Sequence, residues 1–168
     1  MERLNFQRLK EMQGYLDETI VQKHQLQNVD LINKKVVALE VELSEFANEM
    51  RFFKFWSKKG PDYEKALEEF VDSLHFFISL ANDLGIEEPA MPHGASEGKE
   101  SIETVYTKCK QWVLDITKAT DREKQDAWHG AYGYFQQMAS MCGFSEKDIA
   151  EGYVNKMGTN YRRQEQNY

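Results

Sequence analysis

Four carboxylates arranged as two pairs are the residues of this chain best suited to chemistry. Glu42 and Glu45 form an ExxE pair, and Glu69 and Asp72 form an ExxD pair after 23 intervening residues. Residues three apart share one face of a helix, so each segment presents two acids side by side. Like charges about 5 Å apart repel by roughly 3 kcal/mol at an effective dielectric near 20. Such a set of carboxylate oxygens suits a hard divalent cation, and magnesium better than zinc.

The same acids also have a simpler interpretation as a solvated helix face, which is where most acids of an acidic protein lie. Two apolar stripes with helical spacing predict buried helices beside them. The first stripe comprises Leu39, Leu43, Phe46, Met50 and Phe53, and the second comprises Leu67, Phe70, Leu74, Phe77, Ala81 and Leu84. Phe76 lies on the acidic side of the second helix, so we expect this face to meet something other than water.

The composition limits the classes of protein to which the chain can belong. Its 168 residues predict a single domain over residues 1–168, large enough for a core of its own. The net charge of −7 and the pI near 5.2 argue against binding to nucleic acid, which needs a basic surface. Two cysteines and the lack of a long apolar segment predict a soluble cytoplasmic protein without membrane contact.

Helical periodicity runs through nearly the whole sequence and predicts an all-α fold. We expect helices over residues 3–24, 30–58, 62–84, 100–118, 121–142 and 145–160, with a long loop over 85–99. Gly60, Pro61 and Asp62 predict a tight turn that ends one acidic helix and starts the next. The two acidic helices then form an antiparallel hairpin, which brings the two pairs of carboxylates together.

Four motifs in this order resemble the dimeric dUTPases, which belong with MazG to the all-α nucleotide pyrophosphohydrolase superfamily. The first is Gln13 followed four residues later by Asp17. The second and third are the two acidic pairs with the segments that follow them, Phe53-Lys54-Phe55-Trp56 and Ser73-Leu74-His75-Phe76. The last is Tyr153-Val154-Asn155-Lys156 followed by Asn160, Arg163, Gln164 and Tyr168. Together the motifs span residues 13–168.

The resemblance implies an activity and a set of roles. A helical bundle built on the acidic hairpin would hold magnesium ions through Glu42, Glu45, Glu69 and Asp72. Glu42 would also orient and deprotonate the attacking water. The expected reaction is hydrolysis of dUTP, and also of dUDP, in which dUTP yields dUMP and pyrophosphate. The expected partners are this nucleotide and a second copy of the chain, because the family forms homodimers.

The resemblance also implies which residues contact the nucleotide. Gln13 can both donate to and accept from the edge of uracil, Phe76 could stack on the base, and His75 and Trp56 would form walls. Each aromatic side chain could instead be core packing. Lys156, Asn160 and Arg163 recur on one helical face and could bind phosphate, and the polar tail could close over it. The complete expected set is Gln13, Asp17, Trp56, Lys58, His75, Phe76, Lys156, Asn160, Arg163 and Tyr168.

Three alternatives stay open at this point. A related pyrophosphohydrolase would act on another nucleotide, such as dCTP. A ferritin-like di-iron protein would use carboxylates with histidine, for which Asp72 with His75 and Asp126 with His129 give two DxxH pairs. A helical interaction module without enzymatic activity would keep the apolar stripes and leave the acids in water.

Overall fold

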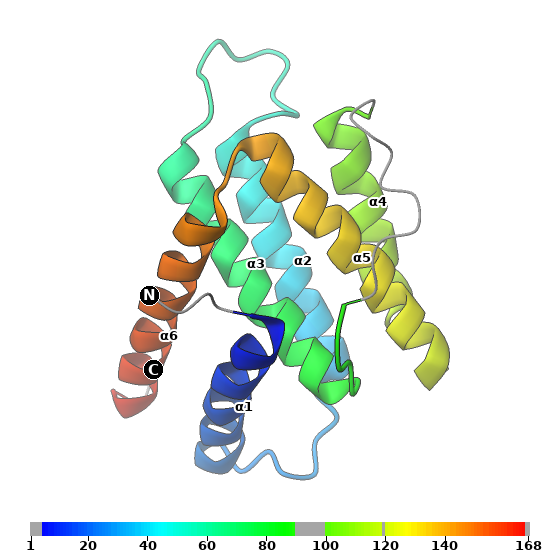
Figure 1. Cartoon of the computed structure of the whole chain (residues 1–168), viewed down its shortest axis with the longest axis vertical. Helices are drawn as coiled ribbons and strands as arrows, with labels where there is room; N and C mark the ends of the chain where they lie inside the picture. The colour runs from blue at the N-terminus through cyan, green and yellow to red at the C-terminus, as the bar shows by residue number, and fades with distance from the viewer. Residues whose placement is uncertain (1–4, 90–99, 119, 167–168) are drawn as a thin grey trace.

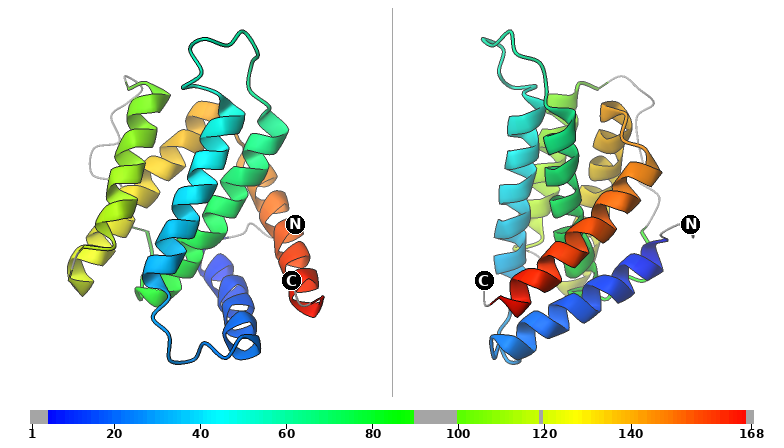
Figure 2. Two further views of the ribbon diagram at one scale, coloured as in Figure 1. Left: turned by 180° about the vertical axis from the view of Figure 1, so that it is seen from behind. Right: turned by 90° about the vertical axis from the view of Figure 1, so that its left-hand side faces the viewer.

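The computed structural model describes residues 5–89, 100–118 and 120–166, and it confirms the all-α prediction (Figure 1). The described helices are α1 (Phe6–Lys23), α2 (Ile32–Met50), α3 (Tyr63–Asp83), α4 (Ile102–Asp115), α5 (Asp121–Cys142) and α6 (Glu146–Glu165). The hairpins α2–α3 and α4–α5 pack together, and α1 and α6 pack against α3 and against each other (Figures 1 and 2). None of the described helices is long and apolar enough to cross a membrane.

Aromatic side chains fill the centre of the molecule and fix α3 in its place. Phe70 of α3 stacks on Phe135 of α5 with ring centroids 3.9 Å apart, and Phe46 of α2 contacts Phe70 edge to face. The indole nitrogen of Trp128 donates to the carbonyl of Phe77 over 2.9 Å. Most of the two predicted apolar stripes is buried in this core. The opposite side of α3 is therefore left to face α1 and α6.

Local sequence signals set the ends of the helices that carry the acids and the basic tail. Asp62 caps α3 as predicted, because its carboxylate accepts from the backbone amide of Lys65 over 3.2 Å. At the start of α6, Ser145 accepts from the backbone amide of Asp148. The preceding Gly143 has a φ of 73°, in the left-handed region that favours glycine. This turn reverses the chain so that α6 returns along α3.

The prediction of one helix over residues 30–58 is wrong, because α2 ends at Met50. Arg51 adopts a left-handed conformation with φ of 61°, and its guanidinium then donates to the hydroxyl of Ser57 and to the carbonyl of Lys59. Residues 51–62 thus form a loop that these bonds organise, in place of the expected tight turn. Phe53 continues the helical spacing of the stripe, but it lies on this loop and is 45% exposed.

The basic C-terminal segment differs from its prediction in length. The sequence predicts a helix that ends near residue 160, followed by a polar tail, whereas α6 continues to Glu165. Tyr161 contributes to this extension because its half-buried ring packs against the core. Lys156, Asn160 and Arg163 consequently lie on one continuous helix. Tyr168 and residues 90–99 of the predicted loop lie outside the described residues.

Candidate functional site

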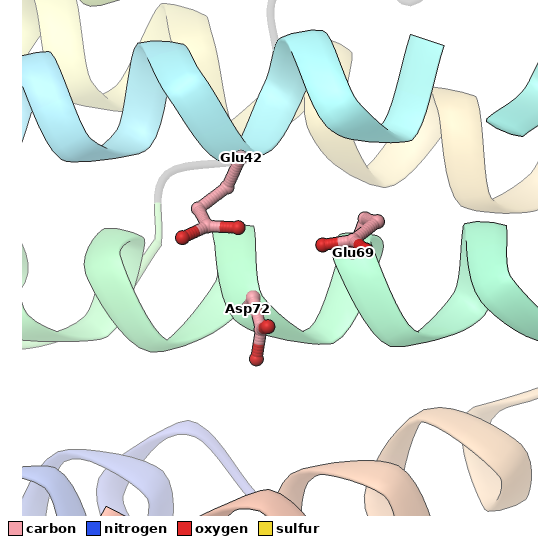
Figure 3. Close-up of side chains that lie close together, drawn as sticks. All are labelled: Glu42, Glu69 and Asp72. Atoms are coloured by element: carbon pink, nitrogen blue, oxygen red, sulfur yellow. The ribbon is translucent and has the colours of Figure 1, made fainter. Parts of the chain in front are cut away.

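Three of the four predicted metal-binding carboxylates meet where α2 faces α3. Glu42 comes from α2, and Glu69 and Asp72 come from α3, with one oxygen of each within 4.8 Å of the others (Figure 3). All three side chains are half-buried. The hairpin therefore brings one acid of the first pair against both acids of the second, although the loop between the helices is longer than expected.

Burial and mutual repulsion make these carboxyls hard to ionise together. Burial raises the pKa of Glu42 to about 7, with Asp72 and Glu45 adding to the shift. The pKa of Glu69 is raised to about 7 as well, first by burial and then by the neighbouring acids. Burial also raises the pKa of Asp72, against the opposing effect of Lys156. A cation placed among these oxygens would favour the ionised form of all three.

Lys156 is a cation that already lies at the cluster. Its ammonium group donates to Asp72 Oδ2 and lies 3.8 Å from Glu68 Oε1. This ion pair ties α6 to α3 beside the acids. Arg163 also lowers the pKa of Glu42 and Asp72, but two positive charges are still fewer than the charges of three ionised carboxylates, so a divalent ion could offset the remaining negative charge.

The donor set fits magnesium and does not fit the di-iron alternative. Hard cations that prefer oxygen ligands bind carboxylates, and the cluster offers only carboxylate oxygens. Among the described residues, the group of possible metal ligands includes neither His75 nor His129. Glu45 is exposed and lies outside the group, although it is close enough to raise the pKa of Glu42 and Glu69.

A cavity of about 440 Å³ lies beside the cluster, between α1, α2, α3 and α6. Glu42 and Asp72 border it at the carboxylate side, so the cluster and the cavity form one site. Most of the predicted nucleotide contacts also border the cavity, namely Gln13, Asp17, His75, Phe76, Lys156, Asn160 and Arg163. The last three residues therefore lie on the face of α6 that borders the cavity.

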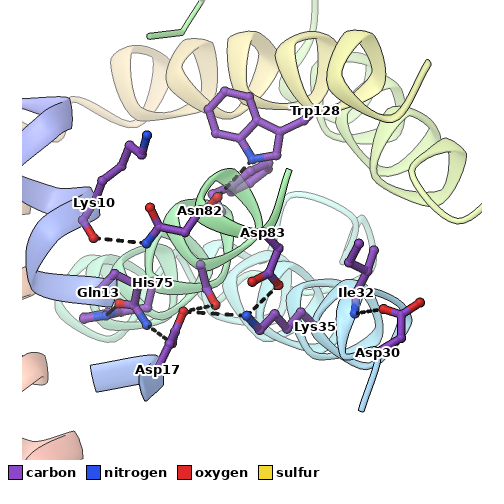
Figure 4. Close-up of polar contacts among 12 residues, drawn as sticks. Lys10, Gln13, Asp17, Asp30, Ile32, Lys35, His75, Asn82, Asp83 and Trp128 are labelled. Atoms are coloured by element: carbon purple, nitrogen blue, oxygen red, sulfur yellow. Dashed lines mark hydrogen bonds and ion pairs between the residues drawn. The ribbon is translucent and has the colours of Figure 1, made fainter. Parts of the chain in front are cut away.

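A network of hydrogen bonds connects the polar residues on the side of the cavity formed by α1 and α3 (Figure 4). Gln13 is 4% exposed, and its amide nitrogen donates to Asp17 Oδ1 over 2.8 Å. Its oxygen Oε1 accepts from the hydroxyl of Tyr153 over 3.0 Å and lies 2.8 Å from His75 Nδ1. Ser79 donates to Asp17 Oδ2 over 2.6 Å. Both the nitrogen and the oxygen of the Gln13 amide thus have hydrogen-bond partners within the protein.

His75 is enclosed between this network and the aromatic ring behind it. Its imidazole is 5% exposed and stacks on Tyr153 with ring centroids 3.9 Å apart and planes 7° from parallel. Burial lowers the pKa of His75 to about 4, so the ring is neutral at pH 7. The ring nitrogen Nε2 is buried and has no hydrogen-bond partner among the described residues.

Sequence reasoning missed Ser79, Lys35 and any specific role for Tyr153. Ser79 follows His75 by four residues, so the helical spacing that groups Asp72, His75 and Phe76 could have found it. Lys35 lies on α2 and contacts Asp17 Oδ2 at 3.6 Å and Asp83 Oδ2 at 2.6 Å. No local pattern marks Lys35, because its partners belong to two other helices.

Two of the residues predicted to contact the nucleotide, Trp56 and Lys58, do not border the cavity of this chain. Trp56 and Lys58 lie on the loop over residues 51–62, where Trp56 is 66% exposed and Lys58 is exposed. Phe55 on the same loop is 92% exposed and packs edge to face on Trp56. Tyr168 falls outside the described residues.

Comparison with known families covers nearly the whole chain. A family model described as dUTPase matches residues 5–168. A search of curated proteins found no match. Because the family match extends over all six described helices, the chain belongs to the all-α dUTPase family and is a dUTP diphosphatase.

Proposed function

We propose that the protein hydrolyses dUTP to dUMP and pyrophosphate with magnesium as its cofactor, and that it also accepts dUDP. The observation that carries this proposal is the continuity of the carboxylate cluster with the polar cavity. Glu42 and Asp72 belong to both, so a nucleotide in the cavity would present its phosphates to the acids. A cytoplasmic location agrees with the two free cysteines, Cys109 and Cys142.

The carboxylates provide the chemistry at the phosphate end. A magnesium ion held by these acids would supply positive charge that offsets the charge of the polyphosphate and makes a nearby water more acidic. Glu42, Glu69 and Asp72 would hold the metal, with the exposed Glu45 as a fourth ligand. Glu42 would accept the proton of the water, a role that suits a half-buried carboxylate whose pKa is raised to about 7. No covalent intermediate is needed.

The cavity face of α6 would bind the phosphates themselves. Lys156, Asn160 and Arg163 border the cavity, and their donors could reach phosphate oxygens together. Lys156 bonds to Asp72 in the absence of a ligand. It would therefore exchange this carboxylate for a phosphate oxygen when nucleotide and metal enter. The exchange keeps the ammonium group paired in both states, which limits the cost of burying it.

The opposite end of the cavity would bind the base. Phe76 borders the cavity and is half-buried, so its ring is available for stacking on uracil. Asp17, Gln13 and His75 provide the polar atoms beside it. The expected direct reading of uracil by Gln13 is restricted, because the oxygen of its amide already faces Tyr153 and His75. The second N–H of its amide group is the donor that remains for the base.

Trp56 and Lys58 require a second copy of the chain to act on the nucleotide. The loop over residues 51–60 carries Arg51, Lys54, Lys58 and Lys59, has no acid, and exposes Phe55 and Trp56. A basic aromatic loop on an otherwise acidic protein is complementary to the acidic site of a partner. We therefore propose a homodimer in which this loop completes the site of the other subunit, and light scattering would give the molecular mass.

A substrate panel tests the proposed function. Purified protein is incubated with each deoxynucleoside triphosphate and with dUDP, with and without magnesium, and the products are separated by anion exchange. We expect dUMP and pyrophosphate from dUTP only when magnesium is present. Glu64→Gln is a matched control, because Glu64 is an exposed acid on α3 that does not border the cavity. A clear preference for dCTP, or equal rates without divalent metal, would contradict the proposal.

A further inference from the structure

Gly152 lies where α6 packs closely against α3. A Cβ atom at this position would lie 2.9 Å from Cγ2 of Val71 on α3, and 3.8 and 3.9 Å from its Cβ and Cγ1 atoms. Carbon atoms in contact prefer separations of roughly 3.5–4.0 Å, so a methyl group does not fit between the two helices. Glycine, which has no Cβ, is the residue that allows their present spacing.

Val71 has little freedom to make room for a larger residue. It is 2% exposed, and its β-branched side chain strongly prefers one rotamer in a helix. The neighbouring Phe70 and Leu74 of α3 are buried in the core as well, so α3 is held in place from its other side. A methyl group at position 152 would therefore move α6 away from α3, by about 0.5–1 Å if the carbon atoms are to regain their preferred separation.

The contact between Gly152 and Val71 lies beside the ion pair that joins α6 to the carboxylate cluster. Asp72 follows Val71 directly, and Lys156 follows Gly152 by four residues, which is about one helical turn. The ammonium group of Lys156 donates to Asp72 Oδ2 and lies 3.8 Å from Glu68 Oε1, and its side chain is 15% exposed. A lysine enclosed to this extent has few other conformations, so a shift of α6 would carry the ammonium group with it.

A second glycine of α6, Gly158, is not constrained in this way. Outside the backbone of its own helix, a Cβ atom on Gly158 would have one neighbour within 4 Å among the described residues, a guanidinium nitrogen of Arg162 at 3.9 Å. Both glycines lie inside a helix, where alanine is more favourable than glycine. Gly158 therefore offers a matched control, in which the same substitution is made in the same helix without affecting the contact with α3.

We propose that Gly152 is a positioning residue for the hydrolysis of dUTP, in that its lack of a side chain sets the spacing of α6 and α3 at which Lys156 reaches the carboxylate cluster and the phosphates. The inference rests on the proposed function, because it takes Lys156 to bind a phosphate. Gly152 itself does not border the cavity, so it acts on the nucleotide only through the placement of α6. A misplacement of about 1 Å can lower activity by roughly 100-fold, so even a smaller shift should be measurable.

The first experiment measures the placement of α6 directly. Crystal structures of the wild-type protein, Gly152→Ala and Gly158→Ala are compared without metal or nucleotide. In Gly152→Ala we expect α6 to lie about 0.5 Å or more farther from α3 at Val71, with the bond between Lys156 and Asp72 lengthened or broken. In Gly158→Ala both should be unchanged. The measurement needs neither magnesium nor turnover, so it does not depend on the proposed function. An unchanged position of α6 in Gly152→Ala would overturn the proposal.

The second experiment measures the effect on the reaction by steady-state kinetics with dUTP and magnesium. We expect Gly152→Ala to raise KM by roughly 3- to 10-fold and to change kcat by less than about 2-fold, because a weakened phosphate contact acts on bound substrate and transition state alike. Gly158→Ala should keep both constants. Thermal melting of the same variants shows that the protein is folded, since the gain in helix propensity offsets the clash at position 152. Equal KM values for the two alanine variants would contradict the proposal.

Two double variants test whether Gly152 acts through Val71 and Lys156. Val71→Ala combined with Gly152→Ala makes room for the added methyl group and should restore the wild-type KM. Lys156→Met combined with Gly152→Ala should have the KM of Lys156→Met alone, because the ammonium group that α6 places is already absent. A failed rescue, or a further rise in KM in the second combination, rejects the role of Gly152 alone. If Lys156→Met by itself leaves KM unchanged, the proposed phosphate contact is wrong and the positioning role is wrong with it.

Discussion

The two ends of the proposed nucleotide cavity differ in how well their polar groups are satisfied by other groups of the protein. At the proposed phosphate end, burial raises the pKa of Glu42, Glu69 and Asp72, neighbouring acids add to the rise, and Lys156 supplies a compensating charge. At the base end, Gln13 uses both its nitrogen and its oxygen in bonds within the protein. The first end is electrostatically strained when empty, and the second is already ordered.

This difference indicates what each end must do. Metal and polyphosphate carry high charge, so a site that repels itself when empty gains binding energy from relief of that repulsion. A base is distinguished from its analogues by the direction of a few hydrogen bonds, and these must be set before binding. Carboxylates that lie close together suit the first task, and a rigid buried network suits the second.

Removing a carboxylate should have the largest effect on activity. A small effect would contradict the proposed difference between the two ends of the cavity. We expect Glu42→Gln and Asp72→Asn each to lower turnover of dUTP by roughly 100-fold or more, because the metal loses a ligand and the water loses its base. Both variants should fold, since an amide is nearly the same size and relieves repulsion. Steady-state rates at saturating magnesium and circular dichroism provide the two measurements.

The exposed Glu45 sharpens this prediction. It lies outside the group of oxygens within 4.8 Å, so Glu45→Gln should lower turnover less than Glu42→Gln does. Near-normal rates in Glu42→Gln and Asp72→Asn would remove the carboxylates from catalysis. An effect at Glu45 as large as that at Glu42 would show that the metal-bound site differs from the arrangement in Figure 3.

Truncation of Gln13 should damage stability as well as recognition, in contrast to the carboxylates. Gln13→Ala leaves the hydroxyl of Tyr153 and Nδ1 of His75 without their acceptor in a buried site. We expect a loss of about 2–4 kcal/mol in the free energy of unfolding, together with weaker use of dUTP. Urea denaturation measures the first effect and steady-state kinetics the second. Unchanged stability would mean that water readily replaces the amide, and that the base end is not rigid.

The sequence was sufficient to predict the all-α fold and the meeting of Glu42 with Glu69 and Asp72, because helical spacing and the hairpin place these acids on facing helices. A step of three residues puts Glu69 and Asp72 on one face, and steps of four and three residues put Lys156, Asn160 and Arg163 on another. These faces border one site in the structure. Short-range periodicity therefore predicted the side of each helix that meets the site.

The sequence could not predict features that depend on contacts between helices or on a single backbone conformation. Helical spacing continues through Phe53, yet the left-handed φ of Arg51 ends α2 before it. Lys35 acquires its role only because α1 and α3 place Asp17 and Asp83 beside it. The constraint on the amide of Gln13 likewise comes from Tyr153, which lies 140 residues away in sequence.

Lys156 pairs with Asp72 at the proposed phosphate end, so its removal tests how the charges of that end are balanced. We expect Lys156→Met to raise the KM for dUTP by roughly 10-fold through loss of a charged phosphate contact. The same change should tighten magnesium binding to the nucleotide-free protein, because Asp72 loses its competing cation. Calorimetry with magnesium alone detects the second effect. Weaker magnesium binding in Lys156→Met would show that the ion pair organises the cluster instead of competing for it.

The smallest expected effect is a pH dependence of stability in the metal-free protein, and it tests whether the phosphate end is strained. The folded state holds the pKa of Glu42 and Glu69 at about 7, above the ordinary value of 4.5. Between these values the folded protein binds more protons than the unfolded chain, so stability falls as pH rises. His75 makes stability rise with pH, because its pKa is lowered from 6.5 to about 4 in the folded state. This contribution to stability is complete above pH 6.5. The interval from pH 6.5 to 8 therefore reports mainly on the carboxyls.

We expect the melting temperature of the metal-free protein to decrease by a few degrees from pH 6.5 to 8, on the order of 1 kcal/mol of stability, because solvent screens these partly exposed groups and reduces the full effect of their pKa shifts. Saturating magnesium should flatten this dependence, because it favours the ionised carboxylates of the folded state. Glu42→Gln should also flatten it without metal, since it removes one titrating group and lowers the pKa of Glu69. His129→Phe, which leaves the cluster intact, should keep the slope. If the wild-type protein melts at the same temperature across this interval without metal, the acids ionise without strain, and the contrast between the two ends of the cavity disappears.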